Sequence, residues 1–275
     1  MPLLRIQAFL RFAPLVGAAT LAACAATSPS ADAPTARRVA ALLPVDALLL
    51  GEQHDAPEHQ VIERETVEAL AARGRLAALA IEMAEEGHAT GYLPPDASEE
   101  QVKAALSWND KAWPWSAYGP AVMAAVRAGV PVVGANLPRE HMKDAMADVS
   151  LDAQLTVEAR TAQEDAVRAG HCNLLPESQI APMTRIQIAR DRAMAQAIVK
   201  SRAPGKTVLL VSGAGHANKA LGVPQHLPTD VSVKVVQMQA GAPQGTAGAF
   251  DTAWPTPPVP EKDYCAEIRP VRRAS

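Results

Sequence analysis

The chain has 275 residues, of which 48% are hydrophobic and 20% are charged, and its formal net charge is -3 at pH 7. This composition is typical of a folded globular protein, and the length allows one large domain or two small ones. Because cations are not in excess, the composition excludes nucleic acid as an expected partner.

Residues 1–23 have the layout of a secretory signal peptide. Arg5 and Arg11 are their only charges, the remainder is mostly apolar, and the stretch is too short for a stable membrane span. The segment Leu21-Ala22-Ala23-Cys24 resembles the lipobox of bacterial lipoproteins, in which the cysteine is acylated and becomes the mature N-terminus. Lipid at Cys24 would anchor the protein to a membrane of the bacterial cell envelope, and analogy favours the outer membrane. The alternative is a free cysteine near an ordinary cleavage site.

Residues 24–38 would hold the lipidated cysteine and a flexible tether, because the stretch after Cys24 is rich in Ala, Ser and Pro. We expect residues 39–275 to form a single domain.

Short apolar runs alternate with amphipathic segments through this domain. The pattern predicts an α/β fold, with a mostly parallel sheet, helices on both faces and a helical insertion at about 139–201. The predicted strands cover residues 47–50, 77–83, 130–133, 207–212 and 231–238, and the predicted helices cover 57–73, 98–107, 119–128, 139–148, 155–169 and 177–201.

Two cysteines remain after Cys24. Cys172 and Cys265 are an even number in a compartment that favours oxidation, which predicts a disulfide between them. The alternatives are two unpaired buried thiols, or thiols that serve as ligands.

Polar side chains follow the predicted strands at the edge where parallel sheets bind ligands. Two strands end in Gly-x-x-His, which places His54 and His216 on loops at this edge, and the glycines permit positive φ and close backbone approach. Asn136 and Arg139 follow a third strand. Each of these side chains has a structural alternative, because a histidine can simply satisfy a loop and the other two can cap a helix.

Glu82 lies inside an otherwise apolar strand. A carboxylate in that position must face a pocket or be paired, because burying it alone costs several kcal/mol. We therefore expect His54, Glu82, Asn136 and His216 to share one crevice. By contrast, Arg185, Arg190, Asp191 and Arg192 fit a salt-bridged helix face.

Four aromatic residues gather in one proline-containing window, from Trp108 to Pro120. Such a group indicates a wall for a flat or apolar ligand, or an interface. The alternative is a satellite cluster that anchors the insertion.

Five motifs in this order resemble the ChaN family, which comprises bacterial haem-binding lipoproteins within the Tiki and erythromycin-esterase-like superfamily. The resemblance covers roughly residues 40–240. The motifs are Gly-Glu-x-His at 51–54, Ile-Glu-Met at 81–83, Trp-Pro-Trp-x-x-Tyr-x-Pro at 113–120, Ala-Asn-Leu-Pro-Arg at 135–139 and Gly-x-Gly-His at 213–216.

The resemblance implies a surface lipoprotein for iron or haem acquisition, in which a homodimer forms on haem binding. It implies a tyrosine ligand for the iron, and a histidine and a lysine of the partner subunit on the propionates. Tyr118 matches the aromatic motif and is the first choice for the iron ligand, followed by Tyr92 and then Tyr264. Lys111 and Lys219 are the candidate lysines. The expected haem contacts are Tyr118, His54, Glu82, Asn136, Arg139 and His216.

The same resemblance includes a rival function, because another branch of the superfamily is similar to metal-dependent proteases and a further branch hydrolyses an ester. His54, Glu82 and His216 could hold a divalent ion, zinc or manganese, that activates water for hydrolysis. Alternatively, His54 and Glu82 could act as general bases without metal. A third possibility, a module that binds envelope proteins or peptidoglycan, has no motif in its favour.

Overall fold

The computed structural model describes residues 33–242 and 248–266. The signal peptide, Cys24 and most of the predicted tether lie outside these residues. Within them, no helix combines the length and hydrophobicity that a membrane crossing requires.

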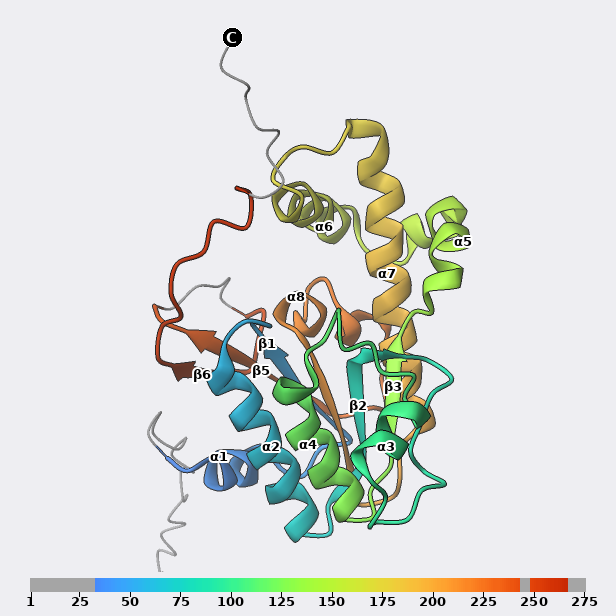
Figure 1. Cartoon of the computed structure of the whole chain (residues 1–275). Coiled ribbons are helices and arrows are strands. Elements are labelled where there is room, and N and C mark those ends of the chain that lie inside the picture. Colours follow the sequence, from blue (N-terminus) through green and yellow to red (C-terminus); the bar gives the residue numbers. More distant parts are fainter. Residues whose placement is uncertain (1–32, 243–247, 267–275) are drawn as a thin grey trace, which may run out of the picture.

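A parallel sheet forms the centre of the protein, and its strand order is β3-β2-β4-β1-β5-β6 (Figure 1). All five neighbouring strand pairs are parallel, so every strand presents its carboxyl end at the same edge. The strands are β1 (Ala47–Glu52), β2 (Leu76–Glu85), β3 (Val132–Asn136), β4 (Thr207–Gly213), β5 (Val233–Ala240) and β6 (Thr252–Thr256).

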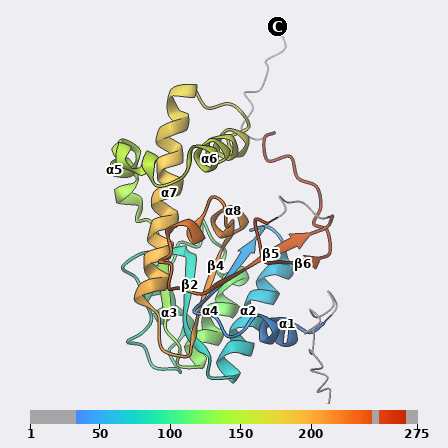
Figure 2. The same cartoon turned by 180° about the vertical axis from the view of Figure 1, so that it is seen from behind.

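Helices cover both faces of the sheet, as the alternating pattern predicts. On one face, α2 (Pro57–Ala72) and α4 (Trp115–Arg127) pack on a core that includes Leu48, Leu50 and Leu79. Figure 2 shows the opposite face, where α7 (Glu177–Lys200) and α8 (Ala214–Ala217) lie. The short helix α8 carries His216, which was expected on a loop. Because both faces are buried, the strands are nearly continuous apolar runs, and every residue of β1 is buried. The α/β fold class is therefore confirmed.

Two elements differ from the sequence expectations. Helix α1 (Thr35–Leu42) occupies the end of the predicted tether, because buried Val39 anchors it on the core. Strand β6 was not expected, since Pro255 lies within it. Proline is tolerated there because β6 is an edge strand, which needs hydrogen bonds on only one side.

The helical segment between β3 and β4 has two parts. Its first part stands above the carboxyl edge of the sheet, and the last part of α7 returns along the sheet and packs on it (Figure 1). Most of the segment is therefore an insertion, but the end of α7 belongs to the layer that covers the sheet. The elements of this segment are η1 (Arg139–His141), α5 (Met142–Ala147), η2 (Val149–Ala153), α6 (Val157–Gly170) and α7 (Glu177–Lys200). The preceding crossover, from β2 to β3, contains α3 (Glu99–Ala105) and α4.

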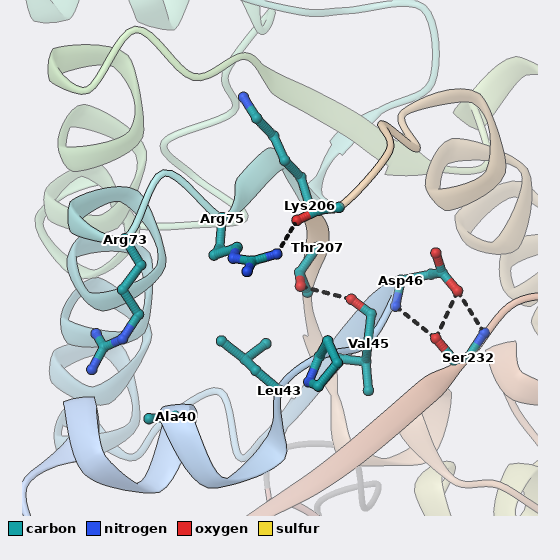
Figure 3. A pocket seen from close by; sticks show the side chains of 11 residues that line it. Ala40, Leu43, Val45, Asp46, Arg73, Arg75, Lys206, Thr207 and Ser232 are labelled. Atoms are coloured by element: carbon teal, nitrogen blue, oxygen red, sulfur yellow. Dashed lines mark hydrogen bonds between the residues drawn. The ribbon is translucent and has the colours of Figure 1, made fainter.

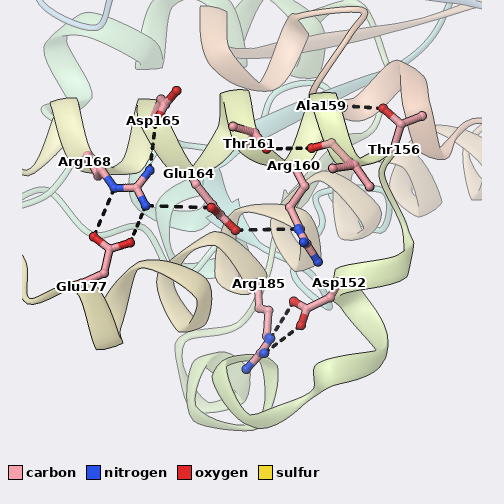
Figure 4. Close-up of polar contacts among 11 residues, drawn as sticks. Asp152, Thr156, Ala159, Arg160, Thr161, Glu164, Asp165, Arg168, Glu177 and Arg185 are labelled. Atoms are coloured by element: carbon pink, nitrogen blue, oxygen red, sulfur yellow. Dashed lines mark hydrogen bonds and ion pairs between the residues drawn. The ribbon is translucent and has the colours of Figure 1, made fainter.

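Ion pairs join the parts of this insertion (Figure 4). Arg168 of α6 lies 2.5 Å from the carboxylate of Glu177 at the start of α7. Arg185 of α7 binds both carboxylate oxygens of Asp152, each at 2.8 Å. The predicted salt-bridged face of α7 is thus present at Arg185.

The predicted disulfide is confirmed. Cys172, just after α6, is bonded to Cys265 with an S–S distance of 2.05 Å. In Figure 1 the chain that follows β6 runs up to α6, so the disulfide fastens the C-terminal segment over the carboxyl edge of the sheet.

Candidate functional site

Two adjoining cavities lie at the carboxyl ends of the strands. The histidine cavity has a volume of about 830 Å³ and is named for His54 and His216 in its wall. The tryptophan cavity has a volume of about 520 Å³ and is named for Trp113. Glu82 and Arg190 line both cavities, so the two form one crevice.

His54 is held by the carboxylate at the end of β1. Its Nδ1 lies 2.8 Å from Glu52 Oε1, and the same carboxylate accepts hydrogen bonds from the Tyr118 hydroxyl at 2.9 Å and from Gln60 Nε2 at 2.6 Å. Burial lowers the pKa of His54, but Glu52 and the charge of Glu82 raise it more, so the net pKa is above its usual value. With Nδ1 occupied, Nε2 is the ring nitrogen left for a ligand.

A second buried acid lies behind Glu52. Glu63 is completely buried on α2, and burial, followed by the charge of Glu52, raises its pKa well above the usual value. Neither oxygen of Glu63 has a hydrogen-bond partner among the described residues. Burial thus favours the neutral form of Glu63, whereas burial of Glu52 is outweighed by the bond and the charge of His54, which lower the pKa of Glu52.

His216 is held by two carboxylates. Its Nδ1 lies 2.6 Å from Asp191 Oδ1, and its Nε2 lies 3.6 Å from Glu82 Oε1. Burial lowers the pKa of His216, but the charges of Asp191 and Glu82 outweigh burial and raise it to about 9. Burial raises the pKa of Asp191 to about 6. At pH 7 this pair is therefore an imidazolium and a carboxylate.

The glycines of the two Gly-x-x-His segments are required by close approach and not by their backbone angles. Gly213 has a φ of -56°, and Gly51 is not among the described glycines with positive φ, so the expectation of positive φ is wrong. A Cβ on Gly213 would lie 3.0 Å from His54 Nε2, and one on Gly51 would lie 2.9 Å from the Ala214 backbone. Side chains at these positions would fill the crevice or push α8 away.

Asn136 and Arg139, both expected to follow the third strand, line the tryptophan cavity, and Asn136 is the last residue of β3. Asn136 Nδ2 donates to the backbone carbonyl of Glu82 at 3.0 Å, and its buried Oδ1 has no hydrogen-bond partner within the described ranges. Arg139 is exposed, and its backbone N–H donates to Glu85 at 3.2 Å. Asn136 therefore reaches the shared crevice through the cavity next to the two histidines.

The aromatic window forms a packed cluster. Trp108 contacts Trp115 edge-on at a centroid distance of 5.0 Å, and Trp113 contacts Tyr118 at 5.8 Å. Trp113 also lines the tryptophan cavity and contacts the His54 ring at 4.9 Å. The rings therefore pack on the main core beside α4 and do not anchor the insertion, and Trp113 also forms a wall of the crevice.

The structure corrects the choice of Tyr118 as the iron ligand. Its side chain is buried, its hydroxyl donates to Glu52, and burial and the negative charge of Glu52 raise its pKa. A ligand of the iron has to face the cavity, and Tyr118 lines neither cavity of the crevice.

The other two tyrosines are accessible. Tyr92 is 75% exposed in the loop after β2 and lines neither cavity of the crevice. Tyr264 lines the histidine cavity, and its hydroxyl donates to Asp55. The disulfide of the neighbouring Cys265 holds Tyr264 at this place. Of the candidate lysines, Lys219 is paired with Asp251 at 3.1 Å.

The divalent ion is not supported. In the described part of the chain, no group of three or more His, Cys, Asp or Glu side chains is arranged to hold a metal. The physical reason is that Glu82 accepts the Gly213 N–H and His216 is held by Asp191 and Glu82, so that among these three residues only His54 keeps a ring nitrogen for a ligand.

The sequence analysis did not select Asp191 as a site residue, because it was expected on a salt-bridged helix face. Asp191 is 1% exposed and bonds His216. A signal was present, because Asp191 falls on the helical stripe of Ile188, Ala195 and Ile198, all of which are buried. A carboxylate on such a stripe must have a partner.

A further cavity of about 630 Å³ lies at the opposite, amino-terminal edge of the sheet (Figure 3). Its two arginines donate hydrogen bonds to the backbone. Arg73 donates to the carbonyls of Ala69 and Ala36, and Arg75 donates to that of Gly205 at 2.7 Å. Arg73 and Arg75 thus satisfy backbone carbonyls, and this structural role accounts for both side chains without a ligand.

Comparisons with known proteins place this geometry in context. The family model described as "Haem-binding uptake, Tiki superfamily, ChaN" matches residues 38–227. No curated protein matches the sequence.

Several solved structures are similar to this chain. A structure described as cofacial haem binding to ChaN of Campylobacter jejuni has 24% identity and a TM-score of 0.65, and the match covers 75% of this chain and 86% of that one. The type III effector HopBA1 has 15% identity and a TM-score of 0.47 over 83% and 95% of the two chains. RRSP, a toxin effector domain from Vibrio vulnificus CMCP6, has 14% identity and a TM-score of 0.46 over 74% and 35%.

Proposed function

The chain belongs to the ChaN family of haem-binding uptake proteins in the Tiki superfamily, and on this basis we propose that it binds haem in the crevice at the carboxyl edge of the sheet. The observation that carries the location is that His54, whose Nε2 is left for a ligand, contacts the Trp113 wall of the crevice.

The residues of the crevice fit haem. Leu106, Leu137 and Met142 line the tryptophan cavity together with Trp113, which provides an apolar surface for a macrocycle. The buried Oδ1 of Asn136, without a partner among the described residues, marks a place for a polar group of the ligand. Haem, when bound, supplies a ferric iron that accepts nitrogen or oxygen ligands.

Two side chains of the histidine cavity would hold the iron. His54 Nε2 is one, because the Glu52 carboxylate fixes the ring through Nδ1, as carboxylates commonly do for metal-binding histidines. The Tyr264 hydroxyl is the other, because Tyr264 lines the same cavity. Ligation through Nε2 requires the ring to keep its proton on Nδ1, where Glu52 Oε1 accepts it at 2.8 Å.

Haem titration tests this proposal. We expect the wild-type protein to give a new Soret band with hemin, and we expect His54→Ala and Tyr264→Phe each to change the spectrum and to weaken binding at least tenfold, through loss of an axial ligand. Tyr92→Phe is the matched control, because Tyr92 is exposed and lines neither cavity of the crevice, so that its hydroxyl can be removed without a change in the spectrum. Wild-type spectra in both of the first two variants would refute these ligands, and absence of any Soret change in the wild type would refute haem binding.

We also propose that the protein acts in haem or iron acquisition as a surface lipoprotein, and that two copies associate on haem binding. The uptake family and the lipobox before Cys24 support this role. Measuring the molar mass in solution with and without hemin tests the dimer, and an unchanged monomer mass would exclude it.

Replacing Cys24 with Ser tests the lipid anchor. We expect the variant to move almost entirely from the membrane fraction to the soluble fraction, because the acyl chains attach to the cysteine sulfur and to the new N-terminus that it forms. Membrane fractionation followed by immunoblotting measures the distribution. Retention equal to that of the wild type would contradict lipidation at this residue.

One observation favours a second candidate, hydrolysis without metal. Two histidines, each paired with a carboxylate, flank Glu82 in one cavity, and such groups can exchange protons with a bound substrate. This function predicts turnover of ester or peptide substrates in the presence of a chelator, with loss of turnover in both His54→Ala and His216→Ala. Full activity in these variants would exclude the candidate.

A further inference from the structure

We propose that Arg190 is a carboxylate-binding residue of the crevice and pairs with a propionate of the bound haem. This inference rests on the proposed function and deepens it. It also revises the sequence expectation that Arg190 belongs to a salt-bridged helix face.

Arg190 is placed where the two cavities meet. It projects from the middle of α7, and its side chain lines both the histidine cavity and the tryptophan cavity. Its Nε is buried and has no hydrogen-bond partner among the described residues. A guanidinium has five N–H donors in a rigid fork that matches a carboxylate, so a buried donor without an acceptor marks a place for a ligand.

Arg38 and Arg160 also have a buried Nε without a hydrogen-bond partner among the described residues, but neither lines the crevice, and other arginines are bound by the protein itself. Arg185, on the same helix, has both carboxylate oxygens of Asp152, and Arg75 has the Gly205 carbonyl. Such contacts explain those arginines as structural groups. Arg190 lines the crevice without an equivalent contact in the described residues.

The nearest carboxylates do not serve Arg190, because they are already engaged. Asp191 binds the imidazole of His216 at 2.6 Å. Glu82 accepts the Gly213 N–H at 2.8 Å through one oxygen and faces His216 with the other. These acids offset part of the positive charge of Arg190 and leave its donor fork available for an external anion.

The surroundings define the class of ligand. Arg139 lines the tryptophan cavity with Arg190, and Trp113 and Leu137 line the same space. Two guanidinium groups beside an apolar wall suit a flat hydrophobic molecule that carries two carboxylates. Haem has this chemistry, because its macrocycle is apolar and its two propionates are anionic.

The experiment compares hemin with the dimethyl ester of hemin, in which both propionates are masked. We expect wild-type protein to bind hemin at least tenfold more tightly than the ester, since a charge-assisted bidentate pair is lost. Arg190→Gln should weaken hemin binding at least tenfold and leave ester binding within about twofold. Arg190→Lys should recover part of the hemin affinity, because it restores the charge without the fork.

Arg192→Gln is the matched control. Arg192 is two residues away on α7 and lines a different cavity, so this variant should bind both probes like the wild type. Thermal unfolding of all variants identifies any loss of fold. The ratio of the affinities for hemin and for its ester is compared within each variant, so it does not depend on the fraction of the protein that is able to bind.

Each outcome decides the matter. If Arg190→Gln weakens both probes equally, or neither, the carboxylate role is wrong while haem binding stands. If the wild type binds both probes equally, propionates are not recognised and the inference fails alone. If the wild type binds neither, the proposed function fails and the inference falls with it.

Discussion

Removal of the Cys172–Cys265 disulfide should lower the free energy of unfolding by about 4–5 kcal/mol, on the loop-entropy model for cysteines 93 residues apart. Without the disulfide, the unfolded chain has a higher conformational entropy, whereas the contacts of the sheet in the folded state remain unchanged. Urea unfolding of the oxidised protein and of the Cys172→Ser/Cys265→Ser variant measures the difference. A reductant should destabilise the former and leave the latter unaffected.

The same change should affect the crevice. Tyr264 precedes Cys265 and lines the histidine cavity, so release of the disulfide frees the segment that positions it. We expect the double serine variant to weaken hemin binding as much as Tyr264→Phe does. Titration of thiols in denatured, unreduced protein should detect neither Cys172 nor Cys265. Two free thiols at these positions, or equal stability of the two proteins, would contradict the prediction.

Asp191→Asn should cost about 3 kcal/mol of stability at pH 7, because it removes the buried carboxylate that holds His216 as an imidazolium. His216 keeps its proton in the folded protein up to a pKa of about 9, against about 6.5 in an unfolded chain. The folded state therefore binds more protons between these values. Its stabilisation is complete below pH 6.5 and is lost as the pH rises through 9.

Chemical unfolding at several pH values between 6 and 10 measures this effect. The wild type should lose stability steadily across the window, and Asp191→Asn should show a much flatter dependence. Asp152→Asn is the control, because it breaks an ion pair of the same helix with Arg185, which does not titrate in this range. If Asp191→Asn keeps the full wild-type slope, His216 is not held as an imidazolium by this contact.

The strands and helices could be predicted from the sequence because their signals are local. A parallel strand covered on both faces reads as a short apolar run, and β1 and β4 are such runs. Helix α6 was placed within two residues by its periodicity. Strand β6 was missed because its proline argues against a central strand, and only the pairing of β5 with β6 shows that it is an edge.

The location of the candidate site could be predicted from the sequence, but the side chains that face it could not. Strand ends that carry Glu52, Glu82 and Gly213 meet because every strand pair is parallel, so the crevice follows from the topology. Which side chains face the crevice depends on rotation about helix axes and on chain closure. Tyr118 shares a motif with Trp113, yet its hydroxyl points inward to Glu52.

By itself, the sequence determined the family, the α/β class and the cysteine pair, because each follows from local order along the chain or from an even count of thiols. Only the tertiary structure decided that Asp191 holds His216, that Arg190 lies between the two cavities and that Tyr264 is brought over the crevice. These contacts join residues from separate segments, and their energies depend on burial. Burial is a property of the packed chain, so no single segment of the sequence carries it.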